Sequence, residues 1–269
     1  MDMQLKLARM PYINVDPFYY ALEYTGKRPD IELVSGYPRQ IGRLAGTKDT
    51  IDAAPISVMD FLNLQESYEP LGRMCVAVKE KAGSVNLFTK IPAEELGNRK
   101  IGITSQTSTS RVLMHLILEQ RYGVKSAEYL DQPEQDDVDA YLLIGNNALV
   151  HAHHGLKGFR YKYDLGEEWY KWTGLPFVFA LWAVRKALPQ QDKDYLTGEL
   201  SGSIDTFWQH EEEMAQTRAD ELLLPPGSIR DYWHLFIYHQ TAAVDKSLEM
   251  FVDSIQDIKG VFAHGQEKI

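Results

Sequence analysis

The sequence predicts an α/β protein with two lobes and a helical C-terminus, and three observations support that fold class. Strand-like and helix-like segments alternate in residues 5–64, beginning with LKLARM and PFYYALEY. A second alternation starts at KIGIT, and from Asp192 onward the pattern is helical. Such alternation usually produces a mainly parallel sheet covered by helices. We expect residues 1–92 with 188–269 to form one lobe and residues 93–187 the other, with hinge segments near 88–95 and 175–190.

Loops that follow strands are the candidate ligand site, because ligands of open α/β sheets bind beyond the carboxyl ends of the strands. Two such lobes predict a cleft between them. The loops placed there by the predicted elements contain Asn14, Ser57, Ser84, Thr104 to Ser110, and Gly145 to Asn147.

Composition limits the class of protein and its partners. The 269 residues, 44% of them hydrophobic, suffice for a sizeable core, and no apolar run approaches the ~20 residues of a membrane span. The start of the chain lacks a secretory pattern, and the single Cys75 suits a packed thiol in a reducing compartment, so we expect a cytoplasmic location. A net charge of -10 argues against nucleic acid but allows a small anion in a local pocket.

The stretch TSQTSTS, residues 104–110, contains six hydroxyl side chains just before a predicted helix. Unpaired backbone N–H groups and the positive end of the helix dipole would attract an anion there, and the hydroxyls add hydrogen-bond donors. The alternative is a helix cap, for which one serine or threonine suffices. The stretch lacks the glycine-rich pattern of a phosphate loop, and its nearest charge is Arg111.

Other candidates for chemistry have simpler explanations. His151, His153 and His154 lack neighbouring ligands that would complete a metal site, so we expect a surface loop there. Ser84 has no matching histidine and aspartate motif for a catalytic triad. The aromatic side chains between Trp169 and Trp182 predict core packing and a hinge between lobes, with one ring free to wall the cleft.

Five blocks of the sequence, spread in order over the chain, resemble the menaquinone-biosynthesis family that contains chorismate dehydratase and, more distantly, 1,4-dihydroxy-6-naphthoate synthase. DLGEEWYKWTGLPFVFALWAVR, residues 164–185, is similar to the family signature. The others are YIN (12–14), IDAAPIS (51–57), GSVNLFTK (83–90) and LLIGNNAL (142–149). The resemblance implies two lobes hinged around a cleft, as in type II periplasmic binding proteins.

The resemblance also implies a reaction, the dehydration of chorismate to 3-[(1-carboxyvinyl)oxy]benzoate in the futalosine route to menaquinone, without a metal or organic cofactor. It marks Asn14 and Ser84 as the residues that orient and polarise the reacting ring. The substrate's own carboxylate would serve as base, and Thr107, Ser108, Thr109 and Ser110 would hold a carboxylate. Ser57, Gly145 and Asn146 would contribute to the substrate site.

Three positions depart from the family pattern. Where relatives carry DTSSRTS, this chain has Thr104 in place of the aspartate and Ser108 in place of the arginine, and Asn146 replaces the acid of LLIGD. Arg111 follows Ser108 by three residues and would supply the missing charge from the same helical face. Two alternatives to the dehydratase therefore stay open. One is a non-catalytic binding protein for an aromatic or dicarboxylate anion, and the other is a 1,4-dihydroxy-6-naphthoate synthase-like enzyme.

Overall fold

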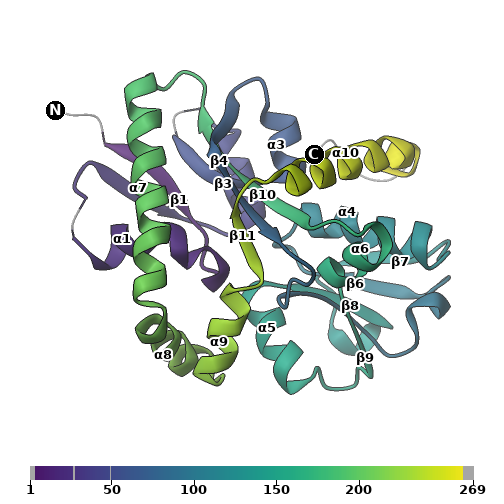
Figure 1. Cartoon of the computed structure of the whole chain (residues 1–269). Helices are drawn as coiled ribbons and strands as arrows, with labels where there is room; N and C mark the ends of the chain where they lie inside the picture. Colours follow the sequence, from purple (N-terminus) through teal and green to yellow (C-terminus); the bar gives the residue numbers. More distant parts are fainter. Residues whose placement is uncertain (1–3, 27, 49, 263–269) are drawn as a thin grey trace.

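Two β-sheets, one in each lobe, organise the computed structural model, which describes residues 4–26, 28–48 and 50–262 (Figure 1). The six-stranded sheet has the order β11-β4-β10-β3-β1-β2. Its strands are β1 (Leu5–Arg9), β2 (Ile31–Ser35), β3 (Ala53–Ser57), β4 (Tyr68–Val78), β10 (Phe177–Arg185) and β11 (Phe236–His239). The five-stranded sheet has the order β7-β6-β8-β5-β9. Its strands are β5 (Val85–Thr89), β6 (Lys100–Ile103), β7 (Glu128–Asp131), β8 (Ala140–Ile144) and β9 (Tyr161–Asp164). The predicted two-lobed α/β class is confirmed.

Both sheets are mixed, whereas the alternation of elements predicted mainly parallel ones. β1 pairs in parallel with β2 and β3, and β6 pairs in parallel with β7 and β8. In contrast, β10 runs antiparallel to β3 and β4, and β5 runs antiparallel to β8 and β9. β5 and β10 are the first strands formed after the chain enters from the other lobe, so the crossings between lobes introduce these four antiparallel pairs. β11 adds a further antiparallel pair with β4 at the edge of the six-stranded sheet.

The chain changes sheets earlier than expected. It leaves the six-stranded sheet after Val78 and enters the other at Val85, then returns between Asp164 and Phe177. The sheets therefore put β5 in the second lobe and β10 in the first, which differs from the expected boundaries at 92 and 187. The physical reason is that the polar segment 79–84 resembles a hairpin turn in the sequence but is itself a crossing between the lobes.

Helices cover both sheets. The first lobe carries the 3-10 turn η1 (Ile13–Val15), α1 (Asp16–Tyr24), α2 (Pro38–Ala45) and α3 (Val58–Leu64). The second carries η2 (Ala93–Glu95), α4 (Thr109–Leu116), the π-helical turn η3 (Ile117–Arg121), η4 (Gln135–Asp137), α5 (Gly145–His154) and α6 (Leu165–Thr173). Local chemistry fixes two of the helix starts, because side chains of Ser57 and Asp164 accept hydrogen bonds from the first turns of α3 and α6.

Four helices make up most of the C-terminal segment: α7 (Gln190–Gln209), α8 (Glu211–Leu222), α9 (Pro226–Trp233) and α10 (Ala242–Phe262). α7 packs along α1, where the Ser203 hydroxyl accepts a hydrogen bond of 2.9 Å from the Ala21 N–H. α10 contacts β10 of the first lobe and α4 of the second, and it crosses the upper side of the molecule in Figure 1. The C-terminal helices thus connect the lobes.

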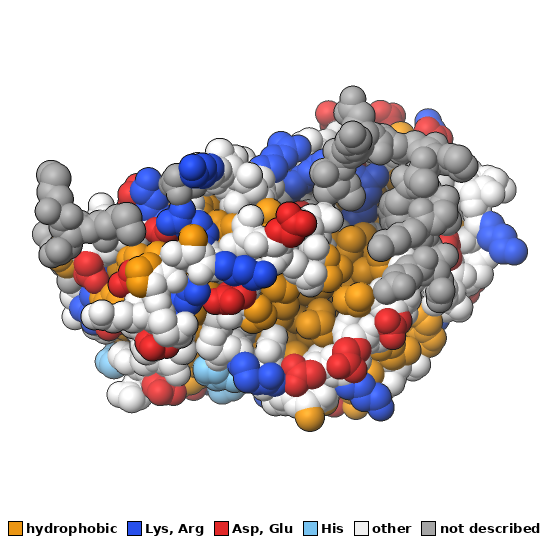
Figure 2. Space-filling model, turned by 90° about the horizontal axis from the view of Figure 1, so that it is seen from above, with side chains coloured by type: hydrophobic (Ala, Val, Ile, Leu, Met, Phe, Trp, Pro, Cys, Tyr) orange, Lys and Arg blue, Asp and Glu red, His pale blue; other side chains and the backbone are white. Residues whose placement is uncertain are grey.

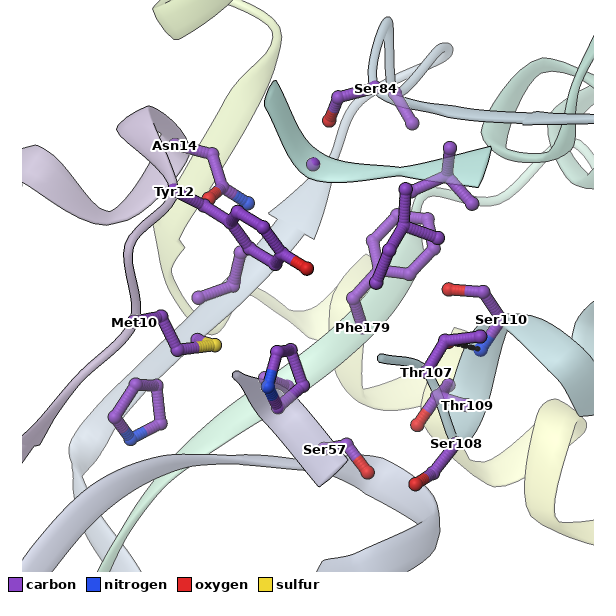
Figure 3. A pocket seen from close by; sticks show the side chains of 18 of the residues that line it. Met10, Tyr12, Asn14, Ser57, Ser84, Thr107, Ser108, Thr109, Ser110 and Phe179 are labelled. Atoms are coloured by element: carbon purple, nitrogen blue, oxygen red, sulfur yellow. Dashed lines mark hydrogen bonds between the residues drawn. The ribbon is translucent and has the colours of Figure 1, made fainter. Parts of the chain in front are cut away.

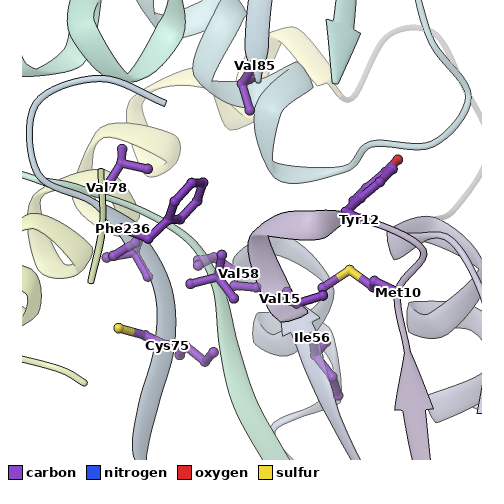
Figure 4. Close-up of a cluster of buried hydrophobic side chains, with 14 of the residues drawn as sticks. Met10, Tyr12, Val15, Ile56, Val58, Cys75, Val78, Val85 and Phe236 are labelled. Carbon is purple, nitrogen blue, oxygen red and sulfur yellow. The ribbon is translucent and has the colours of Figure 1, made fainter. Parts of the chain in front are cut away.

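A single large hydrophobic cluster extends through both lobes, and Figure 4 shows part of it. Trp169, Trp182 and Trp233 are fully buried in this cluster, and the Trp169 ring meets the Phe177 ring edge to face at 5.3 Å. The predicted core role of the aromatic run is therefore confirmed. Cys75 is also fully buried, which confirms the packed thiol, and burial raises its pKa to about 12.

An apolar groove lies outside this core, between α3, β10 and α10, on the side of the molecule that Figure 2 views from above. Hydrophobic side chains gather in a hollow on that side, with charged side chains around it.

Within the described residues, no helix combines the length and the apolar character needed to cross a membrane.

Candidate active site

A cavity between the lobes collects most of the residues that the sequence singled out. It encloses roughly 600 Å³ of space, part of it open to solvent, and Figure 3 looks into it. Of the expected residues, Asn14, Ser57, Ser84, Thr107, Ser108, Thr109, Ser110 and Gly145 line it. Apolar and aromatic side chains complete the wall, among them Met10, Tyr12, Val76, Ile144, Phe179 and Phe236. None of the lining residues is a lysine, arginine, histidine, aspartate or glutamate.

Asn14 and Ser84 lie toward one end of the cavity, and Ser57, Ser108 and Thr109 lie toward the other (Figure 3). The Phe179 ring stands between the two ends, as one ring of the aromatic run was expected to do. We call the end with Asn14 and Ser84 the amide end, and the opposite end the hydroxyl end. The cavity thus brings residues from both lobes to one ligand-sized space.

Asn14 reaches the amide end from the short η1 turn that follows β1. Its backbone carbonyl accepts a hydrogen bond of 3.1 Å from the Tyr238 hydroxyl, and the neighbouring Ile13 carbonyl accepts one of 2.7 Å from the Trp233 indole. Its side-chain Oδ1 atom is buried and has no hydrogen-bond partner among the described residues. A buried amide oxygen without a partner costs free energy, which a ligand donor would recover.

A buried ion cluster anchors the start of α1 directly after Asn14. The Asp16 carboxylate is 2% exposed, and the guanidinium groups of Arg9 and Arg218 each approach it to 2.7 Å. Burial raises the pKa of Asp16, while the two guanidinium groups act to lower it. In the sequence, Asp16 followed by Pro17 is the pattern of an N-cap and a first helical residue. In the structure Val15 is the N-cap, and Asp16 is the first helical residue, with its carboxylate held by the arginines.

Ser84 lies at the end of the crossing segment 79–84, and that segment is held by Asp164. The Asp164 carboxylate accepts hydrogen bonds from the backbone N–H groups of Ala82 and Gly83, and also caps α6. Burial raises the pKa of Asp164, and these backbone hydrogen bonds act to lower it. The Ser84 carbonyl accepts a hydrogen bond of 2.8 Å from the Gly145 N–H, and its hydroxyl lies 2.7 Å from the Tyr232 hydroxyl. Ser84 is therefore held through the backbone that precedes it, through its carbonyl and through its hydroxyl.

At the hydroxyl end, the hydroxyl groups of three neighbouring residues have three different roles. The Thr107 hydroxyl accepts a hydrogen bond of 3.2 Å from the Ser110 N–H, which is a cap for α4. The Thr109 hydroxyl accepts one of 3.1 Å from the Met59 N–H of the first lobe. Ser110 has a buried side chain whose hydroxyl points into the cavity in Figure 3. One hydroxyl therefore caps the helix, one joins the lobes, and one faces the space for a ligand.

A carboxylate of the chain itself already lies against this end. Ser57 donates a hydrogen bond of 2.7 Å to Asp60, and Ser108 from the other lobe bonds the same carboxylate. Burial raises the pKa of Asp60, and these two hydrogen bonds act to lower it. A Cβ at Gly42 would lie 2.6 Å from this carboxyl group, so only glycine allows α2 to pack here. The hydroxyls of Ser57 and Ser108 are therefore already engaged by a carboxylate of the chain itself.

Two expected residues lie elsewhere. Arg111 points to Asp131, with 2.8 Å between their charged atoms, and is not among the lining residues, which differs from the expectation that it supplies the cavity's charge. Asn146 bonds the loop of the other lobe, because its side chain accepts from the Ile13 N–H at 3.1 Å and donates to the Pro11 carbonyl at 3.2 Å. An aspartate has no donor for that carbonyl, so the amide suits this position.

Sequence reasoning missed several residues around the cavity. Asp164 and Tyr12 stand inside blocks of the family resemblance and Gln106 stands inside the 104–110 stretch, but Tyr232 and Asp60 stand outside all of these segments. The Tyr12 hydroxyl donates a hydrogen bond of 2.7 Å to the Gln106 side chain of the other lobe. The Tyr12 ring lies so close to Gly145, whose φ is +67°, that a Cβ there would overlap it. The histidines at 151, 153 and 154 end the helix α5, although a loop was expected. No group of three or more potential metal-binding side chains gathers anywhere in the described part of the chain.

Two α/β lobes around a central cavity define a class, the proteins that share the periplasmic-binding-protein fold. The aliphatic sulphonate-binding protein of Escherichia coli aligns with a TM-score of 0.67 and 12% identity, covering 99% of this chain and 95% of its own. A protein of Archaeoglobus fulgidus aligns with a TM-score of 0.77 and 20% identity, covering 96% of this chain and 98% of its own. At these identities the likeness establishes the fold.

Within that class the chain belongs to the menaquinone biosynthesis family, whose profile matches residues 5–257. The chorismate dehydratase of Thermus thermophilus is 26% identical over 259 residues, which is 91% of this chain and 92% of that protein. The family membership inferred from the five sequence blocks is confirmed.

Proposed function

We propose that the protein removes water from chorismate to give 3-[(1-carboxyvinyl)oxy]benzoate. The observation that carries the proposal is the position of Asn14 and Ser84, the two residues marked by the family resemblance, at the same end of one cavity. Membership of the menaquinone biosynthesis family and the distant similarity to a chorismate dehydratase support it. On this proposal the ligand is a small anion that the enzyme would meet in the cytoplasm.

The reaction balances without an external redox partner. A C–H bond and a C–O bond on neighbouring ring carbons break, the proton and the hydroxyl leave as water, and the ring becomes aromatic. Ser84 would donate a hydrogen bond to the departing hydroxyl, and the Asn14 amide would orient the ring. Among the lining residues only Tyr12 has a titratable side chain, and burial raises its pKa. We therefore assign the role of base to a carboxylate of the substrate.

The hydroxyl end would hold the other carboxylate of the substrate. The Ser110 hydroxyl and the first-turn N–H groups of α4 other than that of Ser110, which bonds Thr107, would supply donors there, and the helix dipole favours negative charge. Phe179 offers a ring face to the developing aromatic product. Because the lining carries no formal charge, affinity for the anion would come from oriented dipoles.

The test is to incubate the purified protein with chorismate and to follow the products by mass spectrometry. Loss of one water from chorismate supports the proposal. Binding of chorismate, seen as a thermal shift, without any consumption contradicts it and favours the alternative, a binding protein for an aromatic or dicarboxylate anion. The uncharged lining of the cavity is the observation that favours this alternative.

Variants of the two marked residues sharpen the test. We expect Ser84→Ala and Asn14→Ala each to lower turnover by at least about tenfold, or ~1.4 kcal/mol in the barrier. Ser105→Ala and Asn63→Ala are matched controls, since neither residue lines the cavity. Steady-state rates check the prediction, and unchanged rates for both Ser84→Ala and Asn14→Ala would remove the assigned roles.

A further inference from the structure

We propose that Tyr232 is a positioning residue, which holds the Ser84 hydroxyl so that its proton is available to the ligand. The inference rests on the proposed function, because it gives Ser84 a partner for the same reaction. Tyr232 belongs to α9, in the C-terminal segment, and none of the five sequence blocks contains it.

The geometry around Ser84 leaves little freedom for its side chain. The two hydroxyl oxygens are 2.7 Å apart, and both residues are 3% exposed. The Tyr232 ring also packs on Gly83, where an added Cβ would lie 3.1 Å from a ring carbon. Gly83 has a φ of +72°, a conformation that favours glycine. The Tyr232 ring therefore packs directly on the backbone of the loop at Gly83. This packing brings the hydroxyls of Tyr232 and Ser84 together.

The direction of the hydrogen bond follows from the partners of each hydroxyl. Across the described residues, Ser84 is the one hydrogen-bond partner of the Tyr232 hydroxyl. A phenol is a stronger donor than an alkyl hydroxyl, and a buried donor without an acceptor is costly. Burial also raises the pKa of Tyr232, so the phenol stays protonated. Tyr232 therefore donates and Ser84 accepts, which leaves the serine proton free to point at the ligand.

The same C-terminal segment also fixes Asn14. The Trp233 indole donates to the Ile13 carbonyl, and the Tyr238 hydroxyl donates to the Asn14 carbonyl. In Figure 1, α9 lies between α8 and α5. One segment near residue 235 therefore sets the positions of both residues at the amide end, although they are 70 residues apart in the chain.

The experiment compares kcat and KM for chorismate in wild-type protein, Tyr232→Phe, Ser84→Ala and the double variant. Tyr68→Phe is the matched control, because the Tyr68 hydroxyl is equally buried and donates over 2.7 Å to the Ile51 carbonyl away from the cavity. We expect Tyr232→Phe to lower kcat by about fivefold to tenfold with KM changed by less than about twofold. Tyr68→Phe should leave kcat unchanged. The double variant should match Ser84→Ala within about twofold, because both changes remove one interaction.

Replacing Tyr232 by para-aminophenylalanine provides a rescue, since the amine keeps a donor at the place of the phenol. Turnover above that of Tyr232→Phe supports the inference. It is overturned if Tyr232→Phe turns over chorismate like the wild type, or if its effect multiplies with that of Ser84→Ala. A wild-type protein that consumes no chorismate instead refutes the proposed function, and the inference with it. The two failures are therefore distinguishable.

Discussion

The two ends of the cavity are held in different ways. At the amide end, Asn14 and Ser84 are fixed by partners far away in the sequence, with Arg218 binding Asp16, Asp164 binding the loop before Ser84, and Tyr232 binding Ser84 itself. At the hydroxyl end, the bonds from Thr107 to Ser110 and from Ser57 to Asp60 each span three residues, and Ser108 and Thr109 bond the facing lobe.

This difference separates the roles of charge and of hydroxyl groups. The charges at the amide end are buried behind the cavity wall, where they hold the backbone, and the wall itself is neutral. A rigid end suits the step that needs precise orientation, since a small displacement of a reacting group costs rate. The hydroxyl end depends on contacts between the lobes, so it can adjust to a bound carboxylate.

Removing the central anchor of the amide end has the largest expected effect. Asp16→Ala leaves two mostly buried guanidinium groups without their carboxylate, and we expect the free energy of unfolding to fall by about 3–5 kcal/mol. Urea denaturation measures this. Asp131→Ala, which breaks the more exposed pair with Arg111 beside the hydroxyl end, should cost less than about 1 kcal/mol. Equal losses in the two variants would contradict the contrast between the ends.

The second expected effect is a loss of stability at acid pH that comes from α4, the helix whose first turn lies at the hydroxyl end. His115 on α4 is 5% exposed, and burial, with a smaller contribution from Arg111, lowers its pKa to about 4. An unfolded histidine takes up its proton near pH 6.5, so the folded state loses relative stability as the pH falls from there to about 4. The loss amounts to roughly 3 kcal/mol, because the folded state binds the proton more weakly.

His115→Gln removes this titration. We expect its free energy of unfolding, measured by urea denaturation at a series of pH values, to fall less steeply than that of the wild type between pH 6.5 and 4. His153→Gln is the control, because that side chain is exposed on α5. Parallel curves for wild type and His115→Gln would show that His115 does not carry the acid sensitivity.

Features carried by local patterns could be predicted from the sequence. The alternation of elements predicted the α/β class and two lobes, and the loops that follow strands led to eight residues that line one cavity. The helix predicted after the hydroxyl-rich stretch begins at Thr109, within that stretch, because capping chemistry is local. The choice of sheet for β5 could not be predicted, since a polar turn of six residues looks the same whether it folds back or crosses to another lobe.

Contacts between residues that are distant in the sequence could not be predicted either. Asp16 looked like a helix cap, because the arginine that completes its buried cluster follows 202 residues later. Tyr232 carried no signal, since a tyrosine in an amphipathic helix usually serves packing alone. The sequence also did not predict which side of α4 faces the cavity. Spacing put Ser108 and Arg111 on one face, but in the structure α4 begins at Thr109, after Ser108, and Arg111 turns toward β7.

The smallest expected effect therefore concerns Arg111. Because its guanidinium pairs with Asp131 and does not line the cavity, we expect Arg111→Ala to change kcat and KM for chorismate by less than about twofold and the free energy of unfolding by less than about 1 kcal/mol. Asp131→Ala should behave in the same way, since it removes the other half of one pair. A large rise in KM for Arg111→Ala alone would mean that the side chain turns into the cavity when an anion binds. The hydroxyl end would then need a charge as well as its hydroxyls and N–H groups.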